Sequence, residues 1–114
     1  MADDTKDFFS EFKHNMGEAQ KDIPDALNAF GQLFQGSMGD GELTKAEKEA
    51  VAIGIAVAKQ CKECIRLHVE KCLDAGLSRQ QILEAAGVAV MMSGGPAYTQ
   101  IPEVIKALDA LEED

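Results

Sequence analysis

Two segments of this sequence carry helix-start signals that constrain the fold of the whole chain. Thr44 with Glu47, and Ser78 with Gln81, have the spacing of a capping box, in which side chains and backbone N–H groups satisfy each other at a helix N-terminus. Apolar residues at helical spacing follow both boxes, and no segment alternates apolar and polar residues as a half-buried strand does. The sequence therefore predicts an all-α protein.

Apolar spacing and helix-breaking residues place the other helices. Pro24 suits the first position of a helix, Gly76 suits the position after one, and Gly94–Pro96 interrupts the chain. Because repeats and low-complexity linkers are absent, residues 1–114 are expected to form a single compact domain. The second helix should bury Leu27, Phe30, Leu33 and Phe34. About six helices are expected, over residues 4–20, 24–37, 44–59, 61–75, 78–92 and 101–111.

The net charge of the chain, −9, disfavours two classes of partner. Nucleic acids and anionic membrane surfaces both repel a chain with 20 acidic and 11 basic side chains. No apolar run reaches the roughly 18 residues that a membrane span needs, and Met1–Asp4 lacks the basic-then-apolar order of a signal peptide. We therefore expect a cytoplasmic protein that binds neither nucleic acid nor membrane.

The three cysteines are an odd number, which argues against a purely structural disulfide framework. In a reducing compartment, a Cys-x-x-Cys pair such as Cys61 and Cys64 is more often catalytic or metal-binding than a static cross-link. On a helix, this pair shares one face with His68, Cys72 and apolar residues, and charged residues occupy the opposite face. The cysteines and the histidine are therefore expected to point inward.

The spacing of these residues suits dithiol chemistry. Two cysteines three residues apart in the first turn of a helix can reach each other and close a disulfide, and the helix N-terminus favours a thiolate. His68 lies one turn beyond Cys64, where its imidazole can take the thiol proton directly or through a water. The pattern predicts a redox-active pair at Cys61 and Cys64, with His68 as its base.

Glu49 is the only charged residue on an apolar stripe of the preceding helix. A carboxylate that faces an apolar interior needs a partner, and His68 on the next helix is the expected one. A chain from Glu49 through His68 to Cys64 would carry protons to and from the sulfur. The alternative is an ordinary surface carboxylate that pairs with Lys45.

Two other interpretations of the cysteine segment stay open. The cysteines and His68 are zinc-ligand types, but about 12 Å of helix rise separates Cys64 from Cys72, whereas ligands of one zinc lie within roughly 4 Å of each other. A four-ligand site from this helix alone is excluded. A three-ligand site at residues 61, 64 and 68 is not excluded, nor is a site shared between subunits. The thiols could also be inert core residues, which is our expectation for Cys72.

Glu49, eleven further residues and the run Cys61-x-x-Cys64-x-x-x-His68 form a recognisable pattern. It resembles the alkylhydroperoxidase D-like branch of the carboxymuconolactone decarboxylase family. The resemblance is strongest over residues 41–98, the core motif region, and looser from residue 24 onward. The flanking runs that also match are Leu43–Glu49 and Gly76–Ala85.

This resemblance implies an all-helical homo-oligomer, either a trimer or a hexamer, that acts as a thiol-dependent peroxidase or disulfide oxidoreductase. It implies a disulfide that cycles between Cys61 and Cys64. Cys64 would attack an alkyl hydroperoxide, Cys61 would resolve the product, and Glu49 and His68 would relay protons. The redox-active disulfide would need no other cofactor. Its reductant would be a lipoyl group on a partner protein, or another dithiol such as a thioredoxin-like protein.

Glu63 marks where the sequence departs from that family, because alkylhydroperoxidase D carries a second histidine between its cysteines. An anion close to the dithiol would disfavour the thiolate.

The alternative function is a non-catalytic, redox-sensing or metal-holding oligomer. Lactone chemistry of the decarboxylase type is not expected, because the decarboxylase members of the family lack the cysteine pair.

Overall fold

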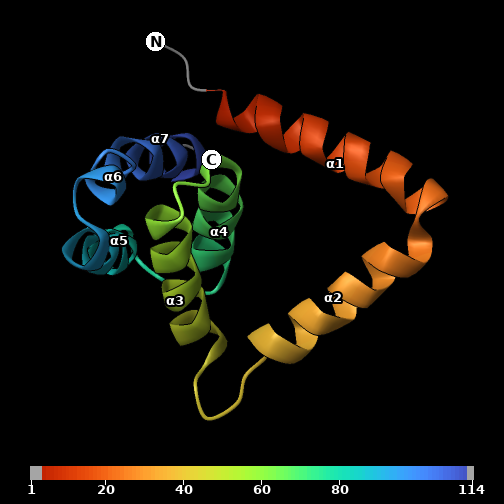
Figure 1. Cartoon of the computed structure of the whole chain (residues 1–114), viewed down its shortest axis with the longest axis horizontal. Helices are drawn as coiled ribbons and strands as arrows, with labels where there is room; N and C mark the ends of the chain where they lie inside the picture. The colour runs from red at the N-terminus through yellow and green to blue at the C-terminus, as the bar shows by residue number, and fades with distance from the viewer. Residues whose placement is uncertain (1–3, 113–114) are drawn as a thin grey trace.

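The computed structural model of the protein describes residues 4–112, which contain helices joined by short turns and no strand (Figure 1). This confirms the all-α prediction. Residues 1–3, which belong to the N-terminal segment that lacks the pattern of a signal peptide, lie outside the described residues. Within residues 4–112, no helix has both the length and the hydropathy of a membrane span. The helices are α1 (Thr5–Asp22), α2 (Pro24–Met38), α3 (Lys45–Ala58), α4 (Lys62–Asp74), α5 (Arg79–Ser93), α6 (Gly95–Tyr98) and α7 (Ile101–Glu112).

Both predicted capping boxes are present, and they begin α3 and α5. The Thr44 hydroxyl accepts the N–H of Glu47 at 3.1 Å, and the Glu47 carboxylate accepts the N–H of Thr44 at 2.8 Å. Ser78 and Gln81 exchange the same two bonds, at 3.1 and 2.8 Å. Each box satisfies two backbone groups that a helix leaves unpaired at its start. The four-residue helix α6, which the sequence did not predict, occupies the break that begins at Gly94.

Residues with positive backbone φ angles follow α3, α4 and α5, and the third of them, Gly94, adopts a φ of 74°. Gly76 adopts a φ of 94° after α4, which agrees with its predicted role as a helix stop, and Gln60 adopts a φ of 56° after α3. Glycine reaches positive φ without a steric penalty, whereas other L residues do not. Gln60 therefore holds a backbone conformation that its side chain disfavours, directly before Cys61.

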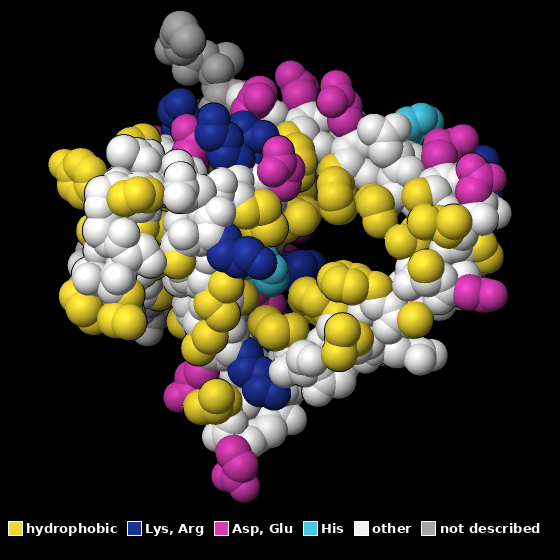
Figure 2. Space-filling model, in the orientation of Figure 1, with side chains coloured by type: hydrophobic (Ala, Val, Ile, Leu, Met, Phe, Trp, Pro, Cys, Tyr) yellow, Lys and Arg dark blue, Asp and Glu magenta, His cyan; other side chains and the backbone are white. Residues whose placement is uncertain are grey.

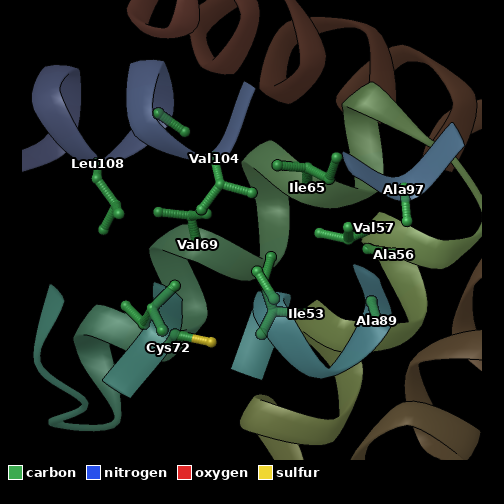
Figure 3. Close-up of a cluster of buried hydrophobic side chains, with 13 residues drawn as sticks. Ile53, Ala56, Val57, Ile65, Val69, Cys72, Ala89, Ala97, Val104 and Leu108 are labelled. Carbon is green, nitrogen blue, oxygen red and sulfur yellow. The ribbon is translucent and has the colours of Figure 1, made fainter. Parts of the chain in front are cut away.

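The hydrophobic core lies between α3, α4, α5 and α7 (Figure 3). Ile53 of α3, Ile65 and Val69 of α4, and Val104 and Leu108 of α7 are fully buried there. A buried aliphatic side chain of this size stabilises a fold by about 1.5–3 kcal/mol relative to an exposed one. We call α3 to α7 (residues 45–112) the body, because all side chains of the core cluster come from these helices.

Helices α1 and α2 (residues 5–38), which we call the arm, extend away from the body and return to it (Figure 1). Contacts of α1 with α7 and of α2 with α3 hold the two ends of the arm. At the first end, Arg66 of α4 pairs with Asp4 at 2.6 Å, and its guanidinium lies 5.2 Å from the centroid of the Phe8 ring. The space-filling view shows an opening between arm and body that apolar side chains line (Figure 2).

The prediction that α2 buries its apolar stripe is wrong. Phe30 and Leu33 are 64% and 65% exposed, Leu27 and Phe34 are half-buried, and α2 contains no fully buried residue. The physical reason is the position of the arm: α2 contacts the body near its end only, so that part of the stripe faces the opening instead of a core. The structure thus leaves a large apolar surface beside α3 and α4.

The positive φ angles of Gln60 and Gly76 predict opposite effects for a matched pair of substitutions. Gln60→Gly should raise the free energy of unfolding by about 0.5–1 kcal/mol, because it removes a disfavoured left-handed conformation. Gly76→Ala should lower it by about 1–2 kcal/mol, because it creates such a conformation. Urea denaturation of both variants, followed by circular dichroism, measures the two changes. Shifts of the same sign in both variants would contradict this account of the helix ends.

Candidate active site

The turn between α3 and α4 delivers the cysteine pair to the start of α4. After α3 ends, the N–H of Gln60 donates to the carbonyl oxygen of Val57 at 3.1 Å. The N–H of Cys61 then donates to the carbonyl oxygen of Ala56 at 3.2 Å. Hydrogen bonds of this kind end a helix when a residue after its last turn has a left-handed backbone conformation. Cys61 thereby becomes the N-cap residue of α4.

Cys61 and Cys64 form a disulfide, with 5.2 Å between their Cα atoms. The predicted reach of two cysteines three residues apart is confirmed. The N–H of Cys64 also donates to the sulfur of Cys61 at 3.2 Å. Because an N-cap atom lies at the positive end of the helix dipole, this position favours a thiolate on Cys61 once the disulfide is reduced.

Glu49 and His68 form a hydrogen bond between α3 and α4. The distance from Nδ1 of His68 to Oε1 of Glu49 is 2.8 Å, and the side chain of Glu49 is 0% exposed while that of His68 is 21% exposed. The predicted contact between these two residues is confirmed. The alternative, a surface pair of Glu49 with Lys45, is wrong because a fully buried carboxylate cannot form one.

This hydrogen bond orients the imidazole of His68. When the carboxylate of Glu49 is ionised it only accepts hydrogen bonds, and the Nδ1–H of His68 then donates to it and leaves Nε2 as the proton acceptor of the ring. The other carboxylate oxygen of Glu49, Oε2, is buried and has no hydrogen-bond partner within residues 4–112. Buried polar atoms without partners are rare in folded proteins and gather at functional sites. The pair can therefore hold or release a proton beside the cysteines.

A groove between the arm and the body contains the inner part of this site. It has a volume of about 340 Å³ and is open to solvent. Cys64 and His68 line it, whereas Cys61 does not, so only one of the two disulfide cysteines borders the groove. The Phe34 ring stacks beside the imidazole of His68, with 6.4 Å between ring centroids. The remaining lining residues of this site groove are Phe30, Leu33, Ser37, Met38, Ala52, Ile55, Ala56 and Lys59.

Cys72 is a core residue, as predicted. It is fully buried (Figure 3), and its thiol donates to the backbone carbonyl oxygen of Glu49 at 3.3 Å. Burial, and then the negative charge of Glu49, raise the pKa of the Cys72 thiol from 9.0 to about 12. A thiol that stays protonated and has no access to solvent is a poor nucleophile. Cys72 is thus separated from the chemistry of the other two cysteines.

Glu63 lies exposed in the first turn of α4. Solvent screens a charge in this position, and an acidic side chain there also interacts favourably with the helix dipole.

Among residues 4–112, no three His, Cys, Asp or Glu side chains lie close enough together to hold a metal ion. The described residues therefore contain no cluster of donor atoms that corresponds to the three-ligand zinc site at residues 61, 64 and 68.

The model of the carboxymuconolactone decarboxylase family matches residues 24–112, which span α2 through α7. The chain belongs to the carboxymuconolactone decarboxylase family. The resemblance that the sequence pattern indicated is thereby confirmed. Membership covers the body and the second helix of the arm, so the site groove lies wholly within the matched residues.

Relatives of known sequence or structure agree with this membership. An uncharacterised protein of Cupriavidus necator is 30% identical over 111 residues, which cover 97% of this chain and 98% of that protein. The alkyl hydroperoxide reductase AhpD of Mycobacteroides abscessus is 28% identical over 69 residues, 60% of this chain and 39% of AhpD. The crystal structure of a carboxymuconolactone decarboxylase family protein from Legionella pneumophila has a TM-score of 0.88 and 34% identity. That match covers 98% of this chain and 97% of the other, so the shared fold includes the arm.

Sequence reasoning missed the contribution of the arm and of Lys59 to the site. Phe30, Leu33 and Phe34 were expected in a core, and they line the site groove instead. The apolar stripe of α2 was visible in the sequence, but a stripe does not reveal whether it faces a core or a groove. No sequence signal places Lys59 on the same groove as Cys64, because the turn between α3 and α4 decides where the two residues lie.

The raised pKa of Cys72 predicts a clear difference in thiol reactivity. In the variant with Cys61→Ser and Cys64→Ser, the remaining thiol of the folded protein should resist iodoacetamide at about pH 9, because Cys72 is buried and its pKa is raised to about 12. Unfolding in urea should expose it to alkylation. Mass spectrometry before and after denaturation measures the difference. Rapid, complete alkylation of the folded variant would contradict the buried, protonated state.

Proposed function

We propose that this chain is a thiol-dependent peroxidase that cycles between a Cys61–Cys64 dithiol and its disulfide. One observation carries the proposal: the disulfide and the Glu49–His68 hydrogen bond meet at the same groove, where Cys64 and His68 are both lining residues. Membership of a family that includes the enzyme AhpD supports it. The catalytic roles of these four residues follow from that arrangement.

In the first step, the thiolate of Cys64 attacks the terminal oxygen of a hydroperoxide, R–O–OH. The O–O bond breaks, the sulfur is oxidised to a sulfenic acid, and the R–O fragment takes a proton and leaves as an alcohol. We assign this step to Cys64 because its side chain lines the site groove, whereas that of Cys61 does not.

In the second step, Cys61 attacks the sulfenic acid of Cys64. An S–S bond forms, and the hydroxyl group leaves as water after it takes a proton. The N-cap position favours a thiolate on Cys61, which makes it suited to this resolving role. The Cα separation of 5.2 Å lets the disulfide form without unwinding of the first turn.

His68 and Glu49 would move the protons in both steps. The free Nε2 of His68 takes the proton from the Cys64 thiol and returns it to the leaving alkoxide. Glu49 accepts the Nδ1–H bond, holds the ring in this tautomer and stabilises the charged imidazolium. The partial exposure of His68 lets it reach the groove, and the burial of Glu49 keeps the carboxylate fixed.

An external dithiol would reduce the disulfide and complete the cycle. Its first thiolate attacks one sulfur to give a mixed disulfide, and its second thiol releases the reduced protein and an oxidised donor. A lipoyl group on a carrier protein or a thioredoxin-like protein has this chemistry. We further propose that no other cofactor takes part, that disulfides are alternative substrates, and that the protein acts in the cytoplasm.

Peroxide oxidation of the reduced protein under anaerobic conditions tests the function directly. Wild type should consume one equivalent of peroxide and form the Cys61–Cys64 disulfide, which mass spectrometry detects. Cys64→Ser should abolish rapid consumption, and Cys61→Ser should stop at a sulfenic acid on Cys64. His68→Gln should lower the oxidation rate by about 100- to 10,000-fold, because the general base is lost. Glu49→Gln should lower the rate less, because the imidazole remains.

His14→Gln is the matched control for His68→Gln, because His14 lies exposed on α1 away from the groove. Glu63→Gln tests the exposed anion between the cysteines and should change the rate little. The proposal fails if wild type forms no internal disulfide with peroxide, or if Cys64→Ser consumes peroxide at the wild-type rate. Stoichiometric oxidation without turnover in the presence of dihydrolipoamide or thioredoxin would indicate a sensor rather than a peroxidase.

We also propose that the protein is a homotrimer or a homohexamer. An apolar depression of about 440 Å³ lies on the outer face of α3 and α5. Val88 and Met92 at this face are 58% and 74% exposed, and Val51 and Ile55 are also exposed. Contiguous apolar surface of this kind mostly marks contact sites between proteins. We call it the α3–α5 face; Ile55 belongs both to this face and to the site groove.

A charged substitution in the α3–α5 face should weaken the assembly. Val88→Glu places a carboxylate in an apolar contact, so sedimentation velocity should show a smaller species than wild type at equal micromolar concentration. Asn15→Glu, which makes the same change of charge at an exposed position of α1, should sediment like wild type. A wild-type protein that sediments as a monomer would rule out the assembly.

A further inference from the structure

We propose that the site groove selects hydroperoxides that carry both an apolar chain and a carboxylate, the chemistry of a fatty-acid hydroperoxide, and that Lys59 determines this specificity. The inference rests on the proposed function, because it names the substrate class of the same site. It is carried by the apolar lining of the groove, by Lys59 within that lining and by Lys71 against the ring of Phe34. Each of these features is independent of the cysteine chemistry.

The lining of the groove is far more apolar than hydrogen peroxide requires. Phe30 and Leu33 of α2 face Ile55 of α3, and all three side chains are more than half exposed in the chain as it stands. A substrate with a hydrocarbon chain would cover this surface and gain roughly 25 cal/mol for each Å² of apolar area removed from water. The groove volume of about 340 Å³ lies within the range of roughly 300–1,000 Å³ that is usual for small-molecule sites.

Lys59 lines the same groove and supplies a positive charge at its edge. Within residues 4–112, Lys59 belongs to none of the ion pairs, although the chain carries 20 acidic side chains. Lys59 is also the C-cap residue of α3 and is exposed, so its ammonium group remains solvated. A carboxylate bound there would keep contact with water and escape most of the desolvation penalty of a buried ion pair.

Lys71 adds a second cation close to Phe34, which lines the groove. Its Nζ atom lies 5.1 Å from the centroid of the Phe34 ring, and Phe34 in turn stacks beside His68. Lys71 likewise belongs to none of the ion pairs within residues 4–112. Figure 2 shows basic side chains and a histidine gathered beside the opening that apolar side chains surround. The groove therefore combines apolar walls with a cationic edge in a protein of net charge −9.

This arrangement would orient the substrate. With the carboxylate at Lys59 and the hydrocarbon chain along α2, the hydroperoxide group is carried inward to Cys64 and His68. The carboxylate stays unchanged while the hydroperoxide is reduced to the alcohol, as in the cycle described above. A neutral ester of the same acid would gain the apolar contacts and lose the contact with Lys59.

The experiment compares linoleic acid hydroperoxide with its methyl ester as substrates of the full-length protein, with dihydrolipoamide as the dithiol. Lys59→Met should raise KM for the acid by about tenfold and leave KM for the ester unchanged. Lys59→Arg should retain the wild-type preference, because it keeps the charge. Lys13→Met, which removes the same charge from an exposed position of α1, should affect neither substrate. Equal KM changes for acid and ester in Lys59→Met would overturn the inference.

A binding measurement separates this inference from the proposed function. Linoleic acid and methyl linoleate, which lack the peroxide, are titrated by calorimetry into the oxidised protein and into Lys59→Met. Tighter binding of the acid that depends on Lys59 supports the inference, even if no peroxide is consumed. Absence of acid binding overturns it, even if other hydroperoxides are reduced. A second copy of the chain seated in the groove would give that negative result, and a cross-link between copies through Leu33→Cys would identify it.

Discussion

The buried hydrogen bond between Glu49 and His68 is the constraint on which the rest of the site depends. A carboxylate removed from water loses several kcal/mol of solvation unless it is paired and its oxygens are satisfied. Here only Oε1 has a partner within residues 4–112, and Oε2 has none. In proteins generally, replacing a buried ion pair by apolar side chains of similar volume is often neutral or stabilising. We infer that this pair is retained for the orientation of the imidazole rather than for stability.

The same residue of α3 contacts α4 at two points one turn apart, since the thiol of Cys72 donates to the backbone carbonyl of Glu49. These two contacts and the shared hydrophobic core hold α4 against α3, and the first turn of α4 carries Cys64 to the groove. The arm completes the opposite wall with α2. Because α2 has no fully buried residue, its local stability is lower than that of the body. Access to Cys64 therefore depends on a helix that is less strongly held than the body.

Local signals in the sequence were sufficient wherever neighbouring residues decide the structure. The capping boxes at Thr44 and Ser78 begin helices because each box is complete within four residues. The disulfide follows from a spacing of three residues in one helical turn. Gln60 shows the limit of such reasoning, because nothing in its side chain indicates a positive φ. Its conformation follows from the turn that connects α3 to α4.

The sequence by itself determined the all-α class, the boundaries of the long helices, the inward face of α4 and the partnership of Glu49 with His68, because helical periodicity and polar pairing are local or nearly local. Only the tertiary structure decided that Phe30 and Leu33 line a groove instead of a core, and that Lys59 lines the same groove as Cys64. An apolar stripe indicates that one face of a helix is unfavourable in water. It does not indicate which other part of the molecule will pack against that face. That choice depends on how the arm leaves the body and returns to it.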